Sequence, residues 1–364
     1  MNDSFSGNRD FFRDCPLSIF HCPFVLFMRS SWKTFLGNVA LLSGTVFLLI
    51  LFLEFLLRLT GIHVMFAQNP PIYRASEDPE ISYELIPSHT AKAYGASITT
   101  NALGFRSPEL SANARPIVLL GDSLVFGFGV RDEEIVGNRL QQLLGYPVLS
   151  AGLSGYTIQQ ERAVFEKKLK ALRPSALIVG FMWNDFDETF VLDEEGYFRP
   201  RSDRSGLTYE EKVAEDVGKP GTLPIPFKGF LQRRSALFTF IERKTKTLPF
   251  RSHAKRRNIF EDPITDVQRS AYEAEFRRLT LVAGDIPKML VIWPEENLHL
   301  ATRKFLHRLG EELGYTVVDL YEIFGNHYES LGWDGHPSAR THEQLAKVIA
   351  DAMEVDPTFA GLLK

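Results

Sequence analysis

Cysteine is scarce in this sequence, which has two such residues in 364, Cys15 and Cys22. The rest of the chain therefore needs no disulfide and can work in either redox compartment. The sequence also lacks Cys and His pairs at zinc-ligand spacing, a glycine-rich phosphate loop ending in Lys-Ser/Thr, and an internal repeat. These absences argue against zinc modules, P-loop enzymes and solenoids, and we expect no metal and no cofactor.

The sequence also has no excess of basic over acidic residues. Lys and Arg number 41 against 45 Asp and Glu, which gives a formal net charge of -4. Nothing in this balance draws the whole chain toward nucleic acid. The hydrophobic fraction of 45% and the charged fraction of 24% are typical of a globular protein with an apolar segment added.

One long apolar segment is present near the N-terminus. No charged residue occurs from Phe35 to Leu53, and with its flanks the run reaches the roughly 20 residues needed to cross a bilayer core. A cleaved signal peptide, the alternative interpretation, usually has an apolar region of about 7–15 residues close to the start. Here more than thirty residues come first. The sequence thus predicts an uncleaved transmembrane helix over residues 34–57.

Basic residues are distributed unevenly around this segment. Those that precede it are Arg9, Arg13, Arg29 and Lys33. After it comes Arg58, and then no basic residue until Arg74. The positive-inside rule therefore places residues 1–33 in the cytoplasm. We expect a single-pass membrane protein with the bulk of its chain outside the cytoplasm, in the periplasm where there is an outer membrane.

The remaining chain alternates between strand-like and helix-like patterns. Residues 58–114, rich in Pro, Ser, Asn and Tyr, are interpreted as a connector. Short apolar runs then predict strands over 116–120, 147–149, 176–179, 288–293 and 316–320. Helical spacing predicts helices over 133–144, 157–172, 298–313 and 339–353. The alternation implies an α/β domain over 115–356, with a parallel sheet and helices on both faces.

An insertion of residues 194–262 interrupts this domain. Its part from 228 to 257 is strongly basic, and the one acid there is Glu242. This stretch could contact anionic lipid headgroups or an acidic polysaccharide. It could equally be an ordinary solvated helix with a flanking loop, and both interpretations stay open.

Residues suited to catalysis follow several of the predicted strands. Gly121-Asp122-Ser123 comes directly after the first strand, and a serine there needs a neighbouring base to become a nucleophile. Gly152 follows the second strand, Asn184 follows the third, and His336 precedes the last helix. The carboxyl ends of parallel strands meet at one edge of a sheet. A nucleophile, a base and donors for an oxyanion are therefore expected to converge there.

In these four ordered motifs the chain resembles the SGNH (GDSL-type) hydrolase superfamily. The stretch Thr100–Arg106, ahead of the first strand, also looks like membrane-anchored bacterial members. The resemblance covers residues 99–353, with the insertion as an extra. The expected fold is a flavodoxin-like three-layer α/β sandwich with a five-stranded parallel sheet.

The resemblance also implies a role for each motif residue. Ser123 would attack the acyl carbonyl, and His336 would accept its proton. The backbone N–H groups of Ser123 and Gly152 and the side-chain amide of Asn184 would form the oxyanion hole. Gly152 suits that place because a residue without a Cβ lets the backbone approach a substrate closely.

Two positions depart from the family pattern. Ser150 stands where the family usually has Asn, two residues before the oxyanion glycine, and we expect a structural role there. The usual acid, three residues before the base, is replaced by Trp333. Asp334 lies two residues before His336 and can orient its ring only if the local chain is extended. Otherwise the carbonyl of Trp333 would fix the ring, which leaves a Ser–His dyad.

Simpler interpretations apply to several other polar residues. Asp122 could cap the turn that follows it. His342, six residues after His336, is interpreted as a surface or packing residue. His299 and His307 lie eight residues apart on one predicted helix, which does not suggest a metal site.

The motifs and the membrane segment together predict a serine esterase or O-deacylase. Its substrate would be an acyl ester, first of all an acetyl ester, of a glycan or cell-envelope component, or a lipid-like ester. An O-acyltransferase acting on an extracytoplasmic polysaccharide is the closest alternative. A catalytically inactive polysaccharide-assembly or binding module is the alternative from another class.

Overall fold

The computed structural model describes residues 23–60, 72–186, 190–192, 198–200, 231, 234–246, 264–293, 300–325, 328–331 and 335–362. By its internal contacts the chain divides into two compact units, Met1–Leu56 and Leu57–Lys364. The first unit is dominated by one helix and the second contains the sheet.

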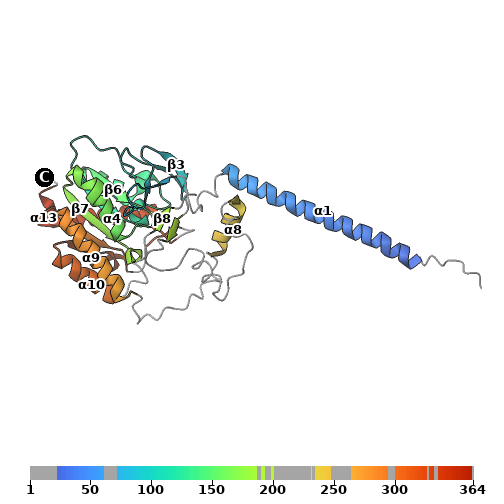
Figure 1. Cartoon of the computed structure of the whole chain (residues 1–364). Helices are drawn as coiled ribbons and strands as arrows, with labels where there is room; N and C mark the ends of the chain where they lie inside the picture. The colour runs from blue at the N-terminus through green and yellow to red at the C-terminus, as the bar shows by residue number, and fades with distance from the viewer. Residues whose placement is uncertain are drawn as a thin grey trace, which may run out of the picture. The chain divides into compact units, whose positions relative to one another are not determined.

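Helix α1 (Pro23–Thr60) is 38 residues long (Figure 1). Its segment Trp32–Leu59 has a mean hydropathy of 2.5, and large apolar side chains such as Leu41 are exposed along it. A helix satisfies its own backbone hydrogen bonds, so such a segment can lie in lipid. The helix is long and apolar enough to cross a membrane, and the predicted span over 34–57 lies inside it.

The second unit is built on a five-stranded parallel sheet. Its strands are β5 (Ile117–Gly121), β6 (Val148–Gly152), β7 (Ala176–Phe181), β10 (Lys288–Ile292) and β11 (Thr316–Asp319). Their spatial order is β6-β5-β7-β10-β11, and every neighbouring pair is parallel. Numbered along the sheet, this is the 2-1-3-4-5 order of flavodoxin-like proteins. The predicted α/β class and flavodoxin-like sheet are confirmed.

Alternation along the strands divides the core between two helical layers. In β5, Val118 and Leu120 point into one cluster, whereas Ile117 and Leu119 point into the other. The first cluster is closed by helices α4 (Ile158–Val164), α9 (Asp266–Ala283) and α10 (Leu300–Glu312) (Figure 1). The second is closed by helices α3 (Val136–Leu144), α11 (Leu320–Phe324), α12 (Ala339–Val355) and α13 (Pro357–Ala360).

Residues 72–101 contribute to this core as well as to the surface. They form two antiparallel pairs, β1 (Tyr73–Ala75) with β2 (Tyr83–Leu85) and β3 (Thr90–Ala93) with β4 (Ala96–Thr99). Tyr83 is fully buried, and it donates a hydrogen bond of 2.8 Å to the carbonyl of Ser154, just after β6. The sequence did not predict these strands, because three or four residues are too few to show a strand period.

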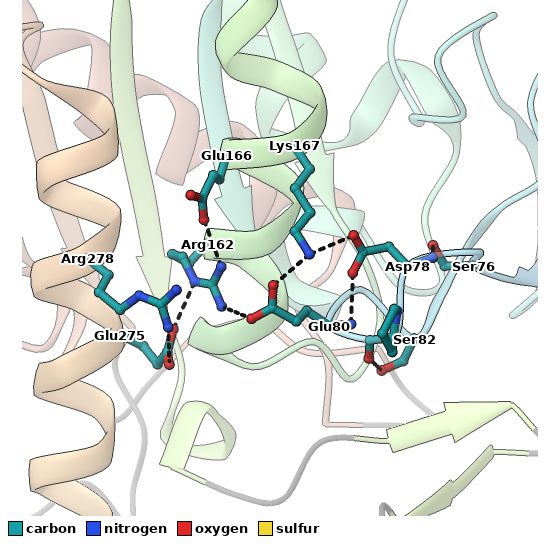
Figure 2. A network of polar contacts seen from close by, with 10 residues as sticks. Ser76, Asp78, Glu80, Ser82, Arg162, Glu166, Lys167, Glu275 and Arg278 are labelled. Carbon is teal, nitrogen blue, oxygen red and sulfur yellow. Dashed lines mark hydrogen bonds and ion pairs between the residues drawn. The ribbon is translucent and has the colours of Figure 1, made fainter.

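A network of ion pairs ties this segment to two helices (Figure 2). The guanidinium of Arg162 in α4 is 1% exposed and pairs with Glu80, Glu166 and Glu275 at 2.7, 2.8 and 2.9 Å. Hydrogen bonds from Arg162 and Lys167 lower the pKa of the Glu80 carboxyl to about 2. Because Glu80 precedes β2 and Glu275 lies in α9, the network fixes residues 78–80 to the helical layer.

The insertion is described only in part. It contains β9 (Phe198–Pro200), which pairs with β8 (Phe190–Leu192) just before the insertion, and helix α8 (Ala236–Lys246). Most of the basic stretch 228–257 lies outside the described residues.

Candidate active site

The serine predicted as nucleophile begins a short helix at the edge of the sheet. Helix α2 (Ser123–Phe126) starts two residues after β5 ends, and Ser123 is its first residue. Asp122 caps this helix, because its Oδ1 accepts a hydrogen bond of 2.9 Å from the N–H of Leu124. The simpler interpretation of Asp122 as a cap is confirmed.

The structure brings Ser123 and His336 together across 213 positions of sequence. The Nε2 atom of His336 lies 2.8 Å from Oγ of Ser123, which is hydrogen-bonding distance. The hydroxyl of Ser123 can also donate to Oδ2 of Asp122 at 3.2 Å. The shorter contact joins the hydroxyl to the imidazole, the arrangement that an activated serine requires.

His336 is held by contacts between residues 330–331 and 336–337. The N–H of Leu331 donates to the carbonyl of His336 at 2.8 Å, and Ser330 bridges to Pro337 in antiparallel fashion. The ring of His336 stacks on that of Phe128, with centroids 4.2 Å apart and planes inclined by 22°. His336, the predicted base, is thus held by its own loop and by the side chain of Phe128, which follows α2.

Three glycines from three neighbouring strands form the surface on which α2 rests. Gly121 pairs with Gly152 on one side and with Gly180 on the other. A Cβ at Gly152 would lie 2.6 Å from Cβ of Val125 and 2.5 Å from the N–H nitrogen of Phe126. Cβ atoms at Gly121 and Gly180 would lie 2.3 and 2.9 Å from Cγ2 of Val125. Gly152 therefore has a packing role at the predicted oxyanion position, whatever its N–H binds.

The predicted amide donor follows the third strand of the parallel sheet in chain order, as the sequence indicates. Asn184 occupies a tight turn, Trp183–Phe186, directly after β7. Burial raises the pKa of the Asp122 carboxyl, while hydrogen bonds from the Leu124 N–H, Ser123 and Asn184 and the charge of His336 act in the opposite direction. The role of Asn184 as an oxyanion donor stays a prediction.

The two departures from the family pattern have different outcomes. Ser150 is buried, and its hydroxyl donates a 3.2 Å hydrogen bond to the carbonyl of Val125, which supports α2 from β6. Asp334 and Trp333 lie outside the described residues, so the choice between a triad and a dyad stays a prediction.

The other histidines have distinct surroundings. His342 is fully buried in α12, so it is a packing residue and not a surface one. His307 lies 2.9 Å from Oδ2 of Asp319, in the one group of potential metal ligands among the described residues, which also includes Glu322. The guanidinium of Arg303 binds the same oxygen at 3.0 and 2.5 Å, so a cation already occupies this position. His299 lies outside the described residues.

Sequence reasoning missed two residues that contact the site elements. Phe128 stacks on the predicted base, and the fully buried Arg106 binds the end of α2. Arg106 belongs to the stretch Thr100–Arg106, which marked a family likeness without indicating a contact. Phe128 is one of 29 phenylalanines, and nothing in its sequence context distinguishes it.

No family model and no curated protein matches the sequence. Among solved structures, the chain is similar to a protein named as a G-D-S-L family lipolytic protein from Desulfitobacterium hafniense DCB-2, with 14% identity over 65% of this chain and 99% of that one, and a TM-score of 0.39. It is similar to a carbohydrate esterase family 2 enzyme from Corynascus thermopiles, with 14% identity over 68% of each chain and a TM-score of 0.38. It is also similar to the psychrotrophic esterase EstA from Pseudoalteromonas, with 12% identity over 66% of this chain and 97% of that one, and a TM-score of 0.38.

At such identities the likeness concerns the fold alone. The strand order, the contact between Ser123 and His336, the place of Gly152 at the end of β6 and the turn with Asn184 after β7 are observations on this chain itself. At the level of the fold, the resemblance to the SGNH (GDSL-type) hydrolases that the sequence indicates is confirmed, and the roles of the motif residues stay predictions.

Proposed function

We propose that this protein is a serine ester hydrolase that forms an acyl-enzyme on Ser123. The observation that carries the proposal is the 2.8 Å contact between Oγ of Ser123 and Nε2 of His336 at the carboxyl edge of the sheet. A serine hydroxyl is a weak nucleophile by itself, and an imidazole within hydrogen-bonding reach is the usual means of activating it.

The reaction would proceed in two halves. Oγ of Ser123 attacks the acyl carbon while its proton passes to Nε2 of His336, and His336 then donates that proton to the leaving alkoxide. In the second half a water molecule gives its proton to His336 and attacks the acyl-enzyme, and the serine regains its proton. The N–H groups of Ser123 and Gly152 and the amide of Asn184 would hold the oxyanion, and each such donor typically contributes about 2.7–4 kcal/mol.

We further propose an acyl ester of a glycan or cell-envelope component as substrate, with acetyl as the first acyl group to test. The apolar helix α1 supports this choice, because an enzyme anchored in a membrane meets envelope polymers and lipids at short range. Residues 1–33 would lie in the cytoplasm and the hydrolase unit outside it.

The activity is tested with a fluorophosphonate probe and with acetate release from 4-nitrophenyl acetate. Wild type should be labelled and should turn over, whereas Ser123→Ala and His336→Ala should lower kcat by a factor on the order of 10⁴–10⁶. Ser111→Ala, which removes an exposed serine ahead of β5, serves as the matched control and should behave as wild type. Absence of labelling in folded wild type would favour the inactive binding module.

A hydrolase can be distinguished from a transferase by incubating the protein with an O-acetylated polysaccharide and a second glycan as acceptor. Free acetate as the sole product supports hydrolysis. Acetylated acceptor that depends on Ser123 would instead identify an O-acyltransferase.

The topology is testable because both natural cysteines precede α1. In intact spheroplasts a membrane-impermeant maleimide should leave Cys15 and Cys22 unlabelled. It should label Ser111→Cys in a chain whose own two cysteines are replaced. The reverse pattern would contradict the proposed orientation.

A further inference from the structure

The arginine at the end of the Thr100–Arg106 stretch is buried beneath the nucleophile helix. Arg106 is 1% exposed, and its guanidinium donates to three backbone carbonyls: to Phe126 at 3.1 Å, to Gly127 at 2.6 Å, and to Val130. All three carbonyls lie within eight residues of Ser123. The guanidinium also lies 5.3 Å from the ring centroid of Phe126, in cation–π range.

A carboxylate fixes the guanidinium from the opposite side. Nε of Arg106 donates to Oδ1 of Asp132 at 2.6 Å, and Oδ2 of the same carboxylate accepts the N–H of Thr99 at 2.9 Å. Burial lowers the pKa of the Arg106 guanidinium, whereas Asp132 acts to raise it. One planar cation thus connects the end of α2 with β4.

Helix α2 needs such support because it is only one turn long. A single turn cannot stabilise itself, and the carbonyls at its end have no partners within the helix. Charge-assisted hydrogen bonds from a buried guanidinium satisfy them and are stronger than bonds between neutral groups. The same segment carries Ser123 at its start and Phe128, which stacks on His336, near its end.

We propose that Arg106 is a positioning residue for the hydrolase reaction: it holds residues 123–130 so that Ser123 and the ring of Phe128 both meet His336. This inference rests on the proposed function. It predicts that charge alone is not sufficient, because a lysine ammonium is a point charge and cannot reproduce the planar fork that binds three carbonyls and a carboxylate.

Arg162 provides a matched control for the cost of removing a buried arginine. Its side chain is likewise 1% exposed and has three charged partners, but these are Glu80, Glu166 and Glu275, and none belongs to residues 123–130 (Figure 2). A purely structural role for Arg106 predicts that the two arginines behave alike.

The experiment compares Arg106→Lys with Arg162→Lys in the full-length protein in detergent. The measurements are kcat and KM for 4-nitrophenyl acetate, the thermal midpoint, and hydrogen exchange of the amides of residues 123–130. Arg106→Lys should lower kcat about 10- to 100-fold, the range expected for a displacement near 1 Å, with KM changed less than about threefold. It should also speed exchange in residues 123–130. Arg162→Lys should lower the midpoint but leave kcat and this exchange close to wild type.

A folded Arg106→Lys protein with wild-type kcat, or an equal loss of kcat in both variants, would overturn the proposal. If Arg106→Lys does not fold, Asp132→Asn provides the test. This substitution removes the carboxylate that binds Nε of Arg106 and retains the guanidinium itself. A fall in kcat at constant KM would then support the proposal, and an unchanged kcat would overturn it. If folded wild type shows neither turnover nor probe labelling, the proposed function fails, while the exchange data still show whether Arg106 holds residues 123–130.

Discussion

The imidazole of His336 lies against the ring of Phe128 with a centroid separation of 4.2 Å. This contact limits the tilt of the imidazole, and in the proposed reaction the face of the Phe128 ring would stabilise the imidazolium form of His336. Tyr94 packs on Phe128 in turn, at 4.3 Å between centroids, so the ring itself is held.

Phe128→Leu should therefore lower kcat with little change in KM. An aromatic contact is worth about 0.5–1.5 kcal/mol beyond its buried area, which corresponds to a loss of about 2- to 13-fold. Phe128→Tyr, which retains the ring, is the control and should stay near wild type. Equal kcat values for the leucine variant and wild type would show that the loop alone fixes His336.

Gly152→Ala should impair both stability and turnover. Its new Cβ would lie 2.5 Å from the backbone nitrogen of Phe126 and 2.6 Å from Cβ of Val125, so α2 must shift away from β6. Overpacking of this kind typically costs about 1–3 kcal/mol, measured here as the free energy of unfolding in urea. At Gly361 a Cβ would meet nothing within 4 Å, and φ is -74°, so Gly361→Ala is the matched control. A Gly152→Ala protein with the stability and kcat of wild type would contradict the close packing of α2.

The sheet and the Ser123–His336 pair could be predicted from sequence because both depend on order along the chain. Buried strands between helices give continuous apolar runs, and the observed β5 and β10 begin and end within one residue of the predicted runs 116–120 and 288–293. Residues after parallel strands meet at one edge, so the motif order was sufficient to bring Ser123 and His336 together.

Contacts that depend on tertiary packing could not be predicted in this way. The stacking of Phe128 on His336 joins residues 208 positions apart, and a phenylalanine after a serine motif has no distinctive pattern. The burial of Arg106 runs against the usual exposure of arginine, and it is explained by three backbone carbonyls at and after the end of α2 and by the carboxylate of Asp132.

Glu161→Gln should stabilise the protein at neutral pH. Glu161 is fully buried in α4, and neither carboxyl oxygen has a hydrogen-bond partner among the described residues. Burial, with a further contribution from the charge of Asp122, raises its pKa well above the ordinary 4.5. For a carboxyl whose folded pKa is raised, the stability present below the unfolded pKa is lost as the pH rises, because the unfolded chain releases the proton more readily. A neutral amide does not incur this loss.

The thermal midpoint of Glu161→Gln should therefore exceed that of wild type at pH 7–8, and the difference should shrink as the pH falls toward 4.5. Glu343→Gln, at an exposed position of α12, is the control and should change the midpoint little. A lower midpoint for Glu161→Gln at pH 8 would indicate that the carboxylate is ionised and satisfied.

His342 should make the folded state sensitive to mild acid. Its ring is fully buried, and neither ring nitrogen has a hydrogen-bond partner within the described part of the chain. Burial, and after it the neighbouring Arg106 and His336, lower its pKa to about 3, and Glu134 opposes this shift. The folded protein thus holds a neutral imidazole, whereas the unfolded chain takes up a proton near the ordinary value of about 6.5.

The sign follows from proton uptake by the unfolded state. The stability associated with neutral His342 is complete above pH 6.5 and is lost as the pH falls toward about 3, at a slope of at most about 1.4 kcal/mol per pH unit. His342→Leu removes this titration. The free energy of unfolding in urea, measured at pH 7.5, 6.5, 5.5 and 4.5, should therefore fall less steeply with decreasing pH in the variant than in wild type. Leucine is chosen because it is apolar and cannot titrate, and other residues of α12, such as Leu345 and Met353, are already buried in an apolar cluster. A parallel loss of unfolding free energy in wild type and His342→Leu below pH 6.5 would contradict this prediction. Carboxylates elsewhere in the chain would then account for the loss of stability in acid.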